Sequence, residues 1–149
     1  ITRIKPIEKM QNKVTNFRDT TNHKYSKYVV DMAIRHNCGT IQMEDLTNIN
    51  KDNVFLKNWS YYDLQQKIKY KAEEKGIEVK LISPKYTSQR CSKCGHIHKG
   101  NRPNQETFKC VKCGFTVNAD YNAARNIATK DIEQIILEQL EFQKEKDIA

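Results

Sequence analysis

Four of the five cysteines form two close pairs. Two residues separate Cys91 from Cys94, two separate Cys110 from Cys113, and 15 residues lie between the pairs. This spacing is typical of a zinc site with four thiolate ligands. A glycine directly follows each pair, and glycine adopts the positive φ that lets backbone N–H groups approach the sulfurs. The pattern predicts one structural Zn²⁺ with no open coordination position.

Other interpretations of the residues around these pairs remain open. Two disulfides would also use four cysteines, although a reducing compartment disfavours them. His96 and His98 could act as metal ligands or contact phosphate. Cys38 is predicted to be a small buried hydrophobic residue at the end of an amphipathic segment. Phe108 and Phe115 flank the second pair, where they would form a small core or stack on a base.

Positive charge gathers around the cysteines. The chain has 26 Lys and Arg, 18 Asp and Glu, and a net charge of +8. Residues 84–116 hold seven basic residues and one acidic residue, so six of the eight positive charges lie there. Such a patch favours a polyanionic partner, although a solvated face is the simpler alternative. The candidate nucleic-acid-binding residues are Lys85, Arg90, Lys93, Lys99, Arg102, Lys109 and Lys112.

Length and composition limit the fold. The 149 residues suffice for about one domain, which excludes two full enzymatic domains. With 38% hydrophobic and 30% charged residues, a modest core is expected. No apolar run approaches the roughly 18 residues of a membrane span, and the first residues do not resemble a signal peptide. We therefore expect a soluble, intracellular chain. It begins at Ile1 rather than Met, so we expect it to be part of something longer.

The apolar periodicity predicts alternating helices and strands. A first helix would follow Pro6 and present Ile7, Met10, Val14 and Phe17, and a second would run from near Asn22 to Gly39. The remaining expected segments are a strand at 40–44, a connection at 48–58, a helix at 61–72 ending before Lys75-Gly76, a strand at 77–82, a helix at 119–128 and a helix from 132. This order is typical of an α/β layer with parallel strands. Two strands are too few for an independent sheet, so further strands are expected upstream.

Two acidic residues lie where α/β proteins place their sites. Glu44 ends the first predicted strand, and Asp120 lies in the first turn of the helix after the cysteines. Sites in open α/β sheets form at the carboxyl ends of strands, and Mg²⁺ prefers carboxylate oxygens. A solvated strand end and a helix-dipole acid are the alternatives. Asp45 points to the opposite strand face from Glu44 and is not a candidate.

Three segments carry a family resemblance. Residues 41–46 (IQMEDL), 86–95 (YTSQRCSKCG) and 120–127 (DYNAARNI) resemble the TnpB-type transposon-encoded nucleases. They equally resemble the miniature type V CRISPR effectors related to those nucleases. The resemblance runs in order from about residue 16 to residue 128. It implies the second and third motifs of a RuvC-like, RNase H-fold nuclease, with Glu44 and Asp120 as metal ligands.

The resemblance also implies a domain organisation. The fold class is then α/β, the C-terminal half of a RuvC-like domain with an inserted zinc ribbon. Residues 1–83 would be the RuvC-like segment with the second-motif Glu. Residues 84–117 would be the zinc ribbon that binds target nucleic acid, and residues 118–149 the C-terminal helices with the third-motif Asp. The implied activity is metal-dependent DNA cleavage guided by RNA, with structural Zn²⁺ and catalytic Mg²⁺.

One family feature is missing from this sequence. The family's first-motif Asp lies on a Gly-Ile-Asp-Leu-Gly strand, and residues 1–22 contain nothing similar. Asp19 and Asp31 lie in helix or turn contexts and do not replace it. The isolated chain is therefore expected to be inactive.

The expected partners are guide RNA, target DNA and the missing N-terminal half of the same protein. The expected location is the cytoplasm of a prokaryotic cell, or of the host of a mobile element or phage, and the choice between transposition and immunity stays open. The alternative function is a zinc-ribbon module that binds nucleic acid without catalysis, or a nuclease remnant with idle acids.

Overall fold

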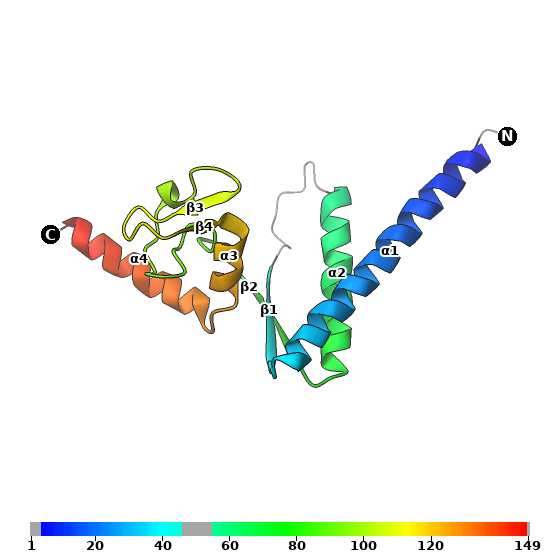
Figure 1. Ribbon diagram of the computed structural model, residues 1–149, viewed down its shortest axis with the longest axis horizontal. Helices are drawn as coiled ribbons and strands as arrows, with labels where there is room; N and C mark the ends of the chain where they lie inside the picture. The colour runs from blue at the N-terminus through cyan, green and yellow to red at the C-terminus, as the bar shows by residue number, and fades with distance from the viewer. Residues whose placement is uncertain (1–3, 46–54, 149) are drawn as a thin grey trace. The chain divides into compact units, whose positions relative to one another are not determined.

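The computed structural model describes residues 4–45 and 55–148 (Figure 1). The chain divides into two compact units, one made of residues 1–41 and 46–80 and the other of residues 42–45 and 81–149. The elements in order are α1 (Ile4–Arg35), β1 (Thr40–Glu44), α2 (Phe55–Glu73), β2 (Glu78–Ile82), a 3₁₀ turn η1 (Lys99–Asn101), β3 (Thr107–Lys109), β4 (Thr116–Asn118), α3 (Ala119–Ile127) and α4 (Ile132–Ile148).

Helix α1 corrects the prediction of two separate helices. It runs without a break from Ile4 to Arg35. The residues between the two expected helices, 18–21, are Arg-Asp-Thr-Thr. They include neither Gly nor Pro, so no residue there stops a helix. Pro6 is accommodated in the first turn, where a missing N–H leaves no intrahelical hydrogen bond unmade.

The C-terminus of α1 also differs from expectation. The helix ends at Arg35 rather than near Gly39, because Asn37 adopts a left-handed φ of 54°. The N–H of Cys38 donates to the carbonyl of Ala33 (2.8 Å), and the N–H of Asn37 donates to Ile34 (3.0 Å). These two bonds form a Schellman motif. Cys38 follows the helix in this turn and is exposed, so the prediction that it is buried was wrong.

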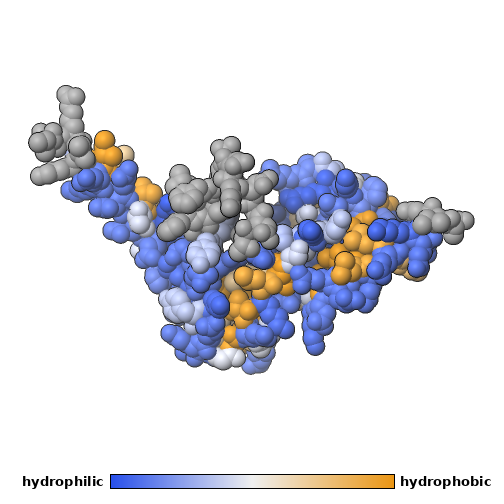
Figure 2. Space-filling model, turned by 180° about the vertical axis from the view of Figure 1, so that it is seen from behind, coloured by the Kyte–Doolittle hydropathy of each residue, from blue (hydrophilic) through white to orange (hydrophobic). Residues whose placement is uncertain are grey.

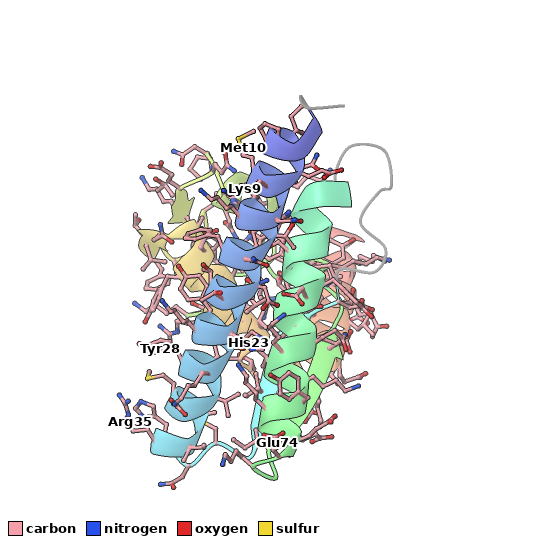
Figure 3. The ribbon with its side chains drawn as sticks, turned by 90° about the vertical axis from the view of Figure 1, so that its right-hand side faces the viewer. Lys9, Met10, His23, Tyr28, Arg35 and Glu74 are labelled. Atoms are coloured by element: carbon pink, nitrogen blue, oxygen red, sulfur yellow. The ribbon has the colours of Figure 1, made fainter. Side chains whose placement is uncertain are left out.

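Helix α2 packs beside α1 in the first unit (Figure 3). The buried apolar residues of this unit are Val30, Ala33, Ile68, Ala72 and Ile77. The expected connection at 48–58 lies partly outside the described residues, and α2 already begins at Phe55. As predicted, Gly76 ends the helix: its φ is +71°, and the N–H of Ile77 donates to the carbonyl of Ala72 at 2.9 Å.

The apolar row near the start of α1 lies on the surface. Ile7, Met10, Val14 and Phe17 are between 52% and 72% exposed. Figure 3 shows Met10 on the N-terminal part of α1, whereas His23 faces α2. Orange atoms beside the grey N-terminal residues in Figure 2 mark the same hydrophobic end. These residues lie on the helix as predicted, but no part of the chain that the structure describes packs over them.

Strands β1 and β2 pair in a two-stranded sheet. The N–H of Glu78 donates to Gly39 (3.0 Å) at one end, and the N–H of Asp45 donates to Ile82 (2.7 Å) at the other. Both strands therefore run in the same direction, as the alternating order predicted. Each strand contributes residues to both compact units.

The second unit combines a small hairpin with two helices. Strands β3 and β4 are antiparallel, with Phe108 opposite Val117. Phe108 is fully buried with Cys91, Cys110 and Ala119, so its predicted core role is confirmed. A separate cluster joins α4 to β2 through Ile82, Ile97, Ile132 and Ile136. Within the described ranges, no helix is both long and apolar enough to cross a membrane.

Candidate functional site

The four paired cysteines meet at one point. The Sγ atoms of Cys91, Cys94, Cys110 and Cys113 all lie within 4.8 Å of one another. Cys91 and Cys113 are 3.8 Å apart at sulfur, and Cys94 and Cys110 are 3.6 Å apart. A tetrahedral Zn²⁺ with Zn–S bonds of about 2.3 Å requires sulfurs about 3.8 Å apart. The cluster can therefore hold a metal ion, and its dimensions fit zinc.

Each pair lies on a matching turn. We call Cys91–Cys94 the first cysteine turn and Cys110–Cys113 the second. The N–H of Gly95 donates to the carbonyl of Cys91 (2.8 Å), and the N–H of Gly114 donates to that of Cys110 (2.9 Å). Both glycines have positive φ, 78° and 71°. This is the backbone geometry that the glycine after each pair predicted.

A buried amide joins the two turns. Asn101, at the end of η1, is fully buried. Its Nδ2 donates to the carbonyls of Gln89 (2.8 Å) and His96 (3.1 Å), which flank the first turn. Its Oδ1 accepts from the N–H of Val111 in the second turn (2.9 Å). The turns are thus aligned by protein contacts as well as by their sulfurs.

The thiols differ in how readily they ionise. Burial raises the pKa of the Cys91 thiol. The backbone N–H of Phe115 is the main cause that lowers the pKa of Cys113, to about 7. Because a metal binds thiolates, the lowered pKa of Cys113 favours metal binding at neutral pH more than the raised pKa of Cys91 does.

Helix α3 presents Asp120 at its first turn. The side chain of Asn118 caps the helix, and its Oδ1 accepts from the N–H groups of Asp120 (3.0 Å) and Tyr121 (3.1 Å). The Asp120 carboxylate is 88% exposed and lies 3.7 Å from Nη2 of Arg102. Arg102 belongs to the cysteine segment, residues 84–117, so that segment reaches the candidate metal ligand.

Two further asparagines attach α3 to the first cysteine turn. Asn122 and Asn126 lie one helical turn apart and are fully buried. The Nδ2 of Asn122 donates to the carbonyl of Arg90 (2.8 Å), and its Oδ1 accepts from the N–H of Ser92 (3.0 Å). The Nδ2 of Asn126 donates to the carbonyls of Thr87 (2.8 Å) and Arg90 (2.7 Å). The helix that carries Asp120 is therefore fixed to the first cysteine turn and the residues just before it.

Glu44 ends β1 in the same compact unit as Asp120. Its Oε1 accepts a long hydrogen bond from the Thr87 hydroxyl (3.4 Å). Two residues earlier, Nε2 of Gln42 donates to the carbonyls of Ile127 (2.7 Å) and Thr129 (2.9 Å). The carboxyl end of β1 is thereby tied to the C-terminal end of α3. The catalytic roles of the two acids stay a prediction.

The basic residues of the cysteine segment fall into two groups. The five lysines, Lys85, Lys93, Lys99, Lys109 and Lys112, are exposed. Arg90 instead donates from Nε to Gln139 (2.8 Å) and from Nη1 to Asn126 (2.7 Å), and burial lowers its pKa. Arg102 donates to the carbonyl of Gln105 (2.9 Å) besides facing Asp120. The lysines are available to a partner, whereas the arginines also organise the site.

Sequence reasoning found the cysteines and missed the buried amides. Asn101, Asn122 and Asn126 carry the connections between the turns and α3. A signal existed for two of them, because Asn122 and Asn126 have the spacing of one helix face. Asparagine is usually exposed, so only the three-dimensional contacts show that these residues are structural.

A family model matches the centre of the chain. The model described as "Cas12f1-like, TNB domain" matches residues 61–127. This range includes the four cysteines, the three buried asparagines and Asp120. The resemblance predicted from the motifs is therefore supported by a family match that includes two of the three motif segments.

Longer relatives cover most of the chain. It is 66% identical over 139 residues to a "CRISPR-associated endodeoxyribonuclease Cas12f1" of Sulfoacidibacillus thermotolerans, which covers 93% of this chain and 33% of the relative. It is 35% identical to the "TnpB-like protein MJ0751" of Methanocaldococcus jannaschii, over 72% of this chain and 41% of that protein.

A solved structure agrees with these matches. A chain in the cryo-EM structure of a Cas12f1–sgRNA–target DNA complex matches with a TM-score of 0.72 at 34% identity, over 85% of this chain and 37% of that one. The chain thus spans between 33% and 41% of the length of these proteins. It is a relative of the TnpB-like and Cas12f1 proteins and corresponds to their C-terminal part.

Proposed function

We propose that this chain is the C-terminal nuclease part of an RNA-guided DNA endonuclease, working with guide RNA, target DNA and an upstream half of the same protein. The names of the Cas12f1 relatives and the sgRNA and target DNA in the similar complex support this activity. The fold would be the C-terminal half of a RuvC-like, RNase H-fold domain. Its location would be the cytoplasm of a prokaryotic cell, in transposition or in immunity.

The observation that carries the proposal is the placement of Asp120. Its carboxylate is 88% exposed, yet its helix is capped by Asn118 and held by Asn126. An exposed acid on a fixed helix suits metal binding, because its oxygens are accessible while its backbone stays in place. Glu44 belongs to the same unit and supplies the second carboxylate.

These acids would bind Mg²⁺. When bound, Mg²⁺ activates a water and stabilises the leaving oxygen of a phosphodiester. Glu44 and Asp120 would hold that ion through their carboxylate oxygens, and Arg102, 3.7 Å from Asp120, would neutralise part of the Asp120 charge. We expect the upstream half to supply the first-motif Asp that the family pattern requires.

The cysteine cluster would have a different role. Four cysteines fill the coordination sphere of one Zn²⁺, so a zinc ribbon there would be structural and closed to substrate. It would keep the cysteine segment folded, so that the exposed lysines of that segment can contact a nucleic-acid strand. Phosphate contacts from these lysines position nucleic acid without reading its sequence.

The test is cleavage by the full-length protein with single acid variants. Asp120→Asn or Glu44→Gln should abolish cutting, with guide and target binding nearly unchanged, because a lost metal ligand acts on the transition state. Asp131→Asn is the matched control, since Asp131 is exposed between α3 and α4. Robust cutting by Asp120→Asn, or equal loss from Asp131→Asn, would reject the assignment.

A binding module without catalysis is the second candidate, and the five exposed lysines favour it. The isolated 149 residues should bind single strands weakly and in a salt-sensitive way. They should not cut with Mg²⁺ or Mn²⁺. Cutting by the isolated chain that disappears with Asp120→Asn would show that two acids suffice.

A further inference from the structure

A hollow lies between the first cysteine turn and α4, wholly within the second unit. Its volume is about 410 Å³, which is within the usual range for small-ligand pockets. We call it the α4 hollow. Cys94 and the following Gly95 line it together with the side chains of His96, Lys112, Gln139, Phe142, Gln143 and Lys146.

Hydrogen bonds from α4 to residues on either side of the first cysteine turn fix its walls. Gln143 forms two bonds with the backbone of Ile97, accepting from its N–H (3.1 Å) and donating to its carbonyl (2.9 Å). Gln139 accepts from Nε of Arg90 at 2.8 Å. A side chain at Gly95 would collide with the Gln139 amide. The helix is thus held close to the turn, and the hollow is preformed.

The lining is basic and carries an aromatic ring. Lys112 comes from the second cysteine turn and Lys146 from α4, and the lining side chains that the structure describes include no Asp or Glu. Phe142 is 56% exposed although the Lys146 ammonium lies 4.4 Å from its ring centroid. Phe142 and Lys146 are four residues apart, so they share one face of α4.

We propose that the α4 hollow binds one nucleotide of a single nucleic-acid strand, with the base against Phe142 and the phosphate between Lys112 and Lys146. An aromatic ring beside cations is how proteins hold single strands without sequence preference, by stacking and by phosphate contact. A duplex keeps its bases stacked inside and offers none to the ring. The inference rests on the proposed function only for the presence of a nucleic-acid partner.

This site extends the basic surface of the cysteine segment onto α4. Sequence alone points away from α4, because most of its charged residues are acidic. Among the described α4 residues that line the hollow, Lys146 is charged and none is acidic. A strand could therefore run from the exposed lysines of the cysteine segment past Lys112 to Phe142.

Crosslinking tests the stacking. The full-length, zinc-loaded protein is irradiated with single-stranded DNA or RNA that carries 5-iodouracil, a base that couples to aromatic rings on which it stacks. Mass spectrometry should find the crosslink at Phe142, and Phe142→Leu should remove it. Leu137→Ala, an exposed apolar residue of α4 outside the lining, should leave it intact. Comparing the DNA and RNA arms identifies which strand occupies the hollow.

Salt titrations test the phosphate contacts. Lys112→Gln and Lys146→Gln should each reduce the salt slope of single-strand binding by about 0.7. Lys144→Gln, an exposed control on α4, should not change it. Phe142→Leu should weaken binding by about 5- to 150-fold with the slope unchanged.

The outcomes separate this inference from the proposed function. Normal cutting and binding without a crosslink at Phe142, or an unchanged slope in Lys146→Gln, would overturn the hollow as a nucleotide site and leave the nuclease proposal standing. Unmodified full-length protein that bound no nucleic acid would overturn both.

Discussion

The helix pair α1–α2 and the cysteine segment both bury polar groups, but they use them differently. Between the helices, Lys67 is only 9% exposed and bridges Asp63 (2.5 Å) and Asp19 (2.9 Å). In the cysteine segment, neutral amides such as Asn101 satisfy backbone groups, and four sulfurs surround one point. Salt and extreme pH weaken the attraction between charged groups. Hydrogen bonds of neutral amides depend instead on close packing, and a cysteine cluster depends on its bound metal ion. The two regions should therefore fail under different conditions.

Metal removal should have the largest effect. Cys110→Ser, or a strong chelator, should release the metal and remove amide protection from residues 84–117, because structural zinc supplies much of the folding free energy of small sites. Helices α1 and α2 should stay protected. Hydrogen exchange measured by segment checks this, with Cys38→Ser, in the exposed turn after α1, as the control. Equal loss of amide protection in α1–α2 and in residues 84–117 would contradict the claim that only the cysteine segment depends on the metal.

Loss of a buried amide should come next. Asn126→Ala removes two bonds to backbone carbonyls and the acceptor of Arg90, so buried groups lose partners. We expect about 3 kcal/mol of destabilisation in zinc-loaded protein, measured by urea unfolding. Gln134→Ala, an exposed side chain on α4, should change stability by less than about 0.5 kcal/mol. Similar urea midpoints of unfolding for Asn126→Ala and Gln134→Ala would contradict the structural role of Asn126.

The ion bridge between the helices should matter less. Lys67→Met leaves Asp19 and Asp63 without their shared cation, and we expect a loss of about 1–2 kcal/mol, because both carboxylates are partly solvated. The exposed pair of Lys27 with Asp31 is the comparison, and Lys27→Met should cost about 0.5 kcal/mol or less. Raising the salt concentration should narrow the difference between these variants. A difference that grows with salt would argue against the electrostatic account.

The smallest effect should be that of pH on the helix pair. Burial would raise the pKa of Asp63, but hydrogen bonds from Asn22 and Lys67 and nearby positive charges lower it below 3.8 overall. Burial opposes the charge on Lys67, but its bonds to Asp63 and Asp19 raise the pKa above 10.5.

The two shifts set a pH window. The Asp63 contribution is complete above pH 3.8 and is lost as pH falls further, and that of Lys67 is complete below pH 10.5 and is lost as pH rises further. After correction for intrinsic rates, amide exchange of α1 should therefore be slowest between pH 3.8 and pH 10.5 and faster outside this range. Protection that declined steadily from pH 5 to pH 9 would contradict this.

Features determined by local chemistry were predictable from the sequence. The cysteine cluster, the glycines after each pair and the strand at 40–44 depend on neighbouring residues, and each is found as expected. The burial of that strand does not alternate, because Ile41 to Glu44 are all partly buried. The continuous α1 was missed because Arg18 to Thr21 contain no positive signal, only the absence of a helix breaker. Cys38 was misplaced because small apolar character says little about burial in a turn.

Features that depend on distant partners were not predictable. The spacing of Asn122 and Asn126 places them on one helix face but does not show that this face is buried. The bonds of the two asparagines join residues more than 30 positions apart. The same holds for the α4 hollow, whose lysines come from residues 112 and 146. The division of the chain at 83 and 117 and the roles of Glu44 and Asp120 stay predictions.

Separating the two metals tests the account most directly. Full-length protein with its guide RNA is loaded with zinc, stripped of Mg²⁺, and assayed for target cleavage as Mg²⁺ is added, while zinc content is measured in the same samples. We expect about one zinc per chain throughout, no cutting without Mg²⁺, and no cutting at any Mg²⁺ concentration by Asp120→Asn with its zinc intact. Cutting that rose and fell with zinc content and ignored Mg²⁺ would contradict the assignment of a structural role to the cysteines and a catalytic one to Glu44 and Asp120.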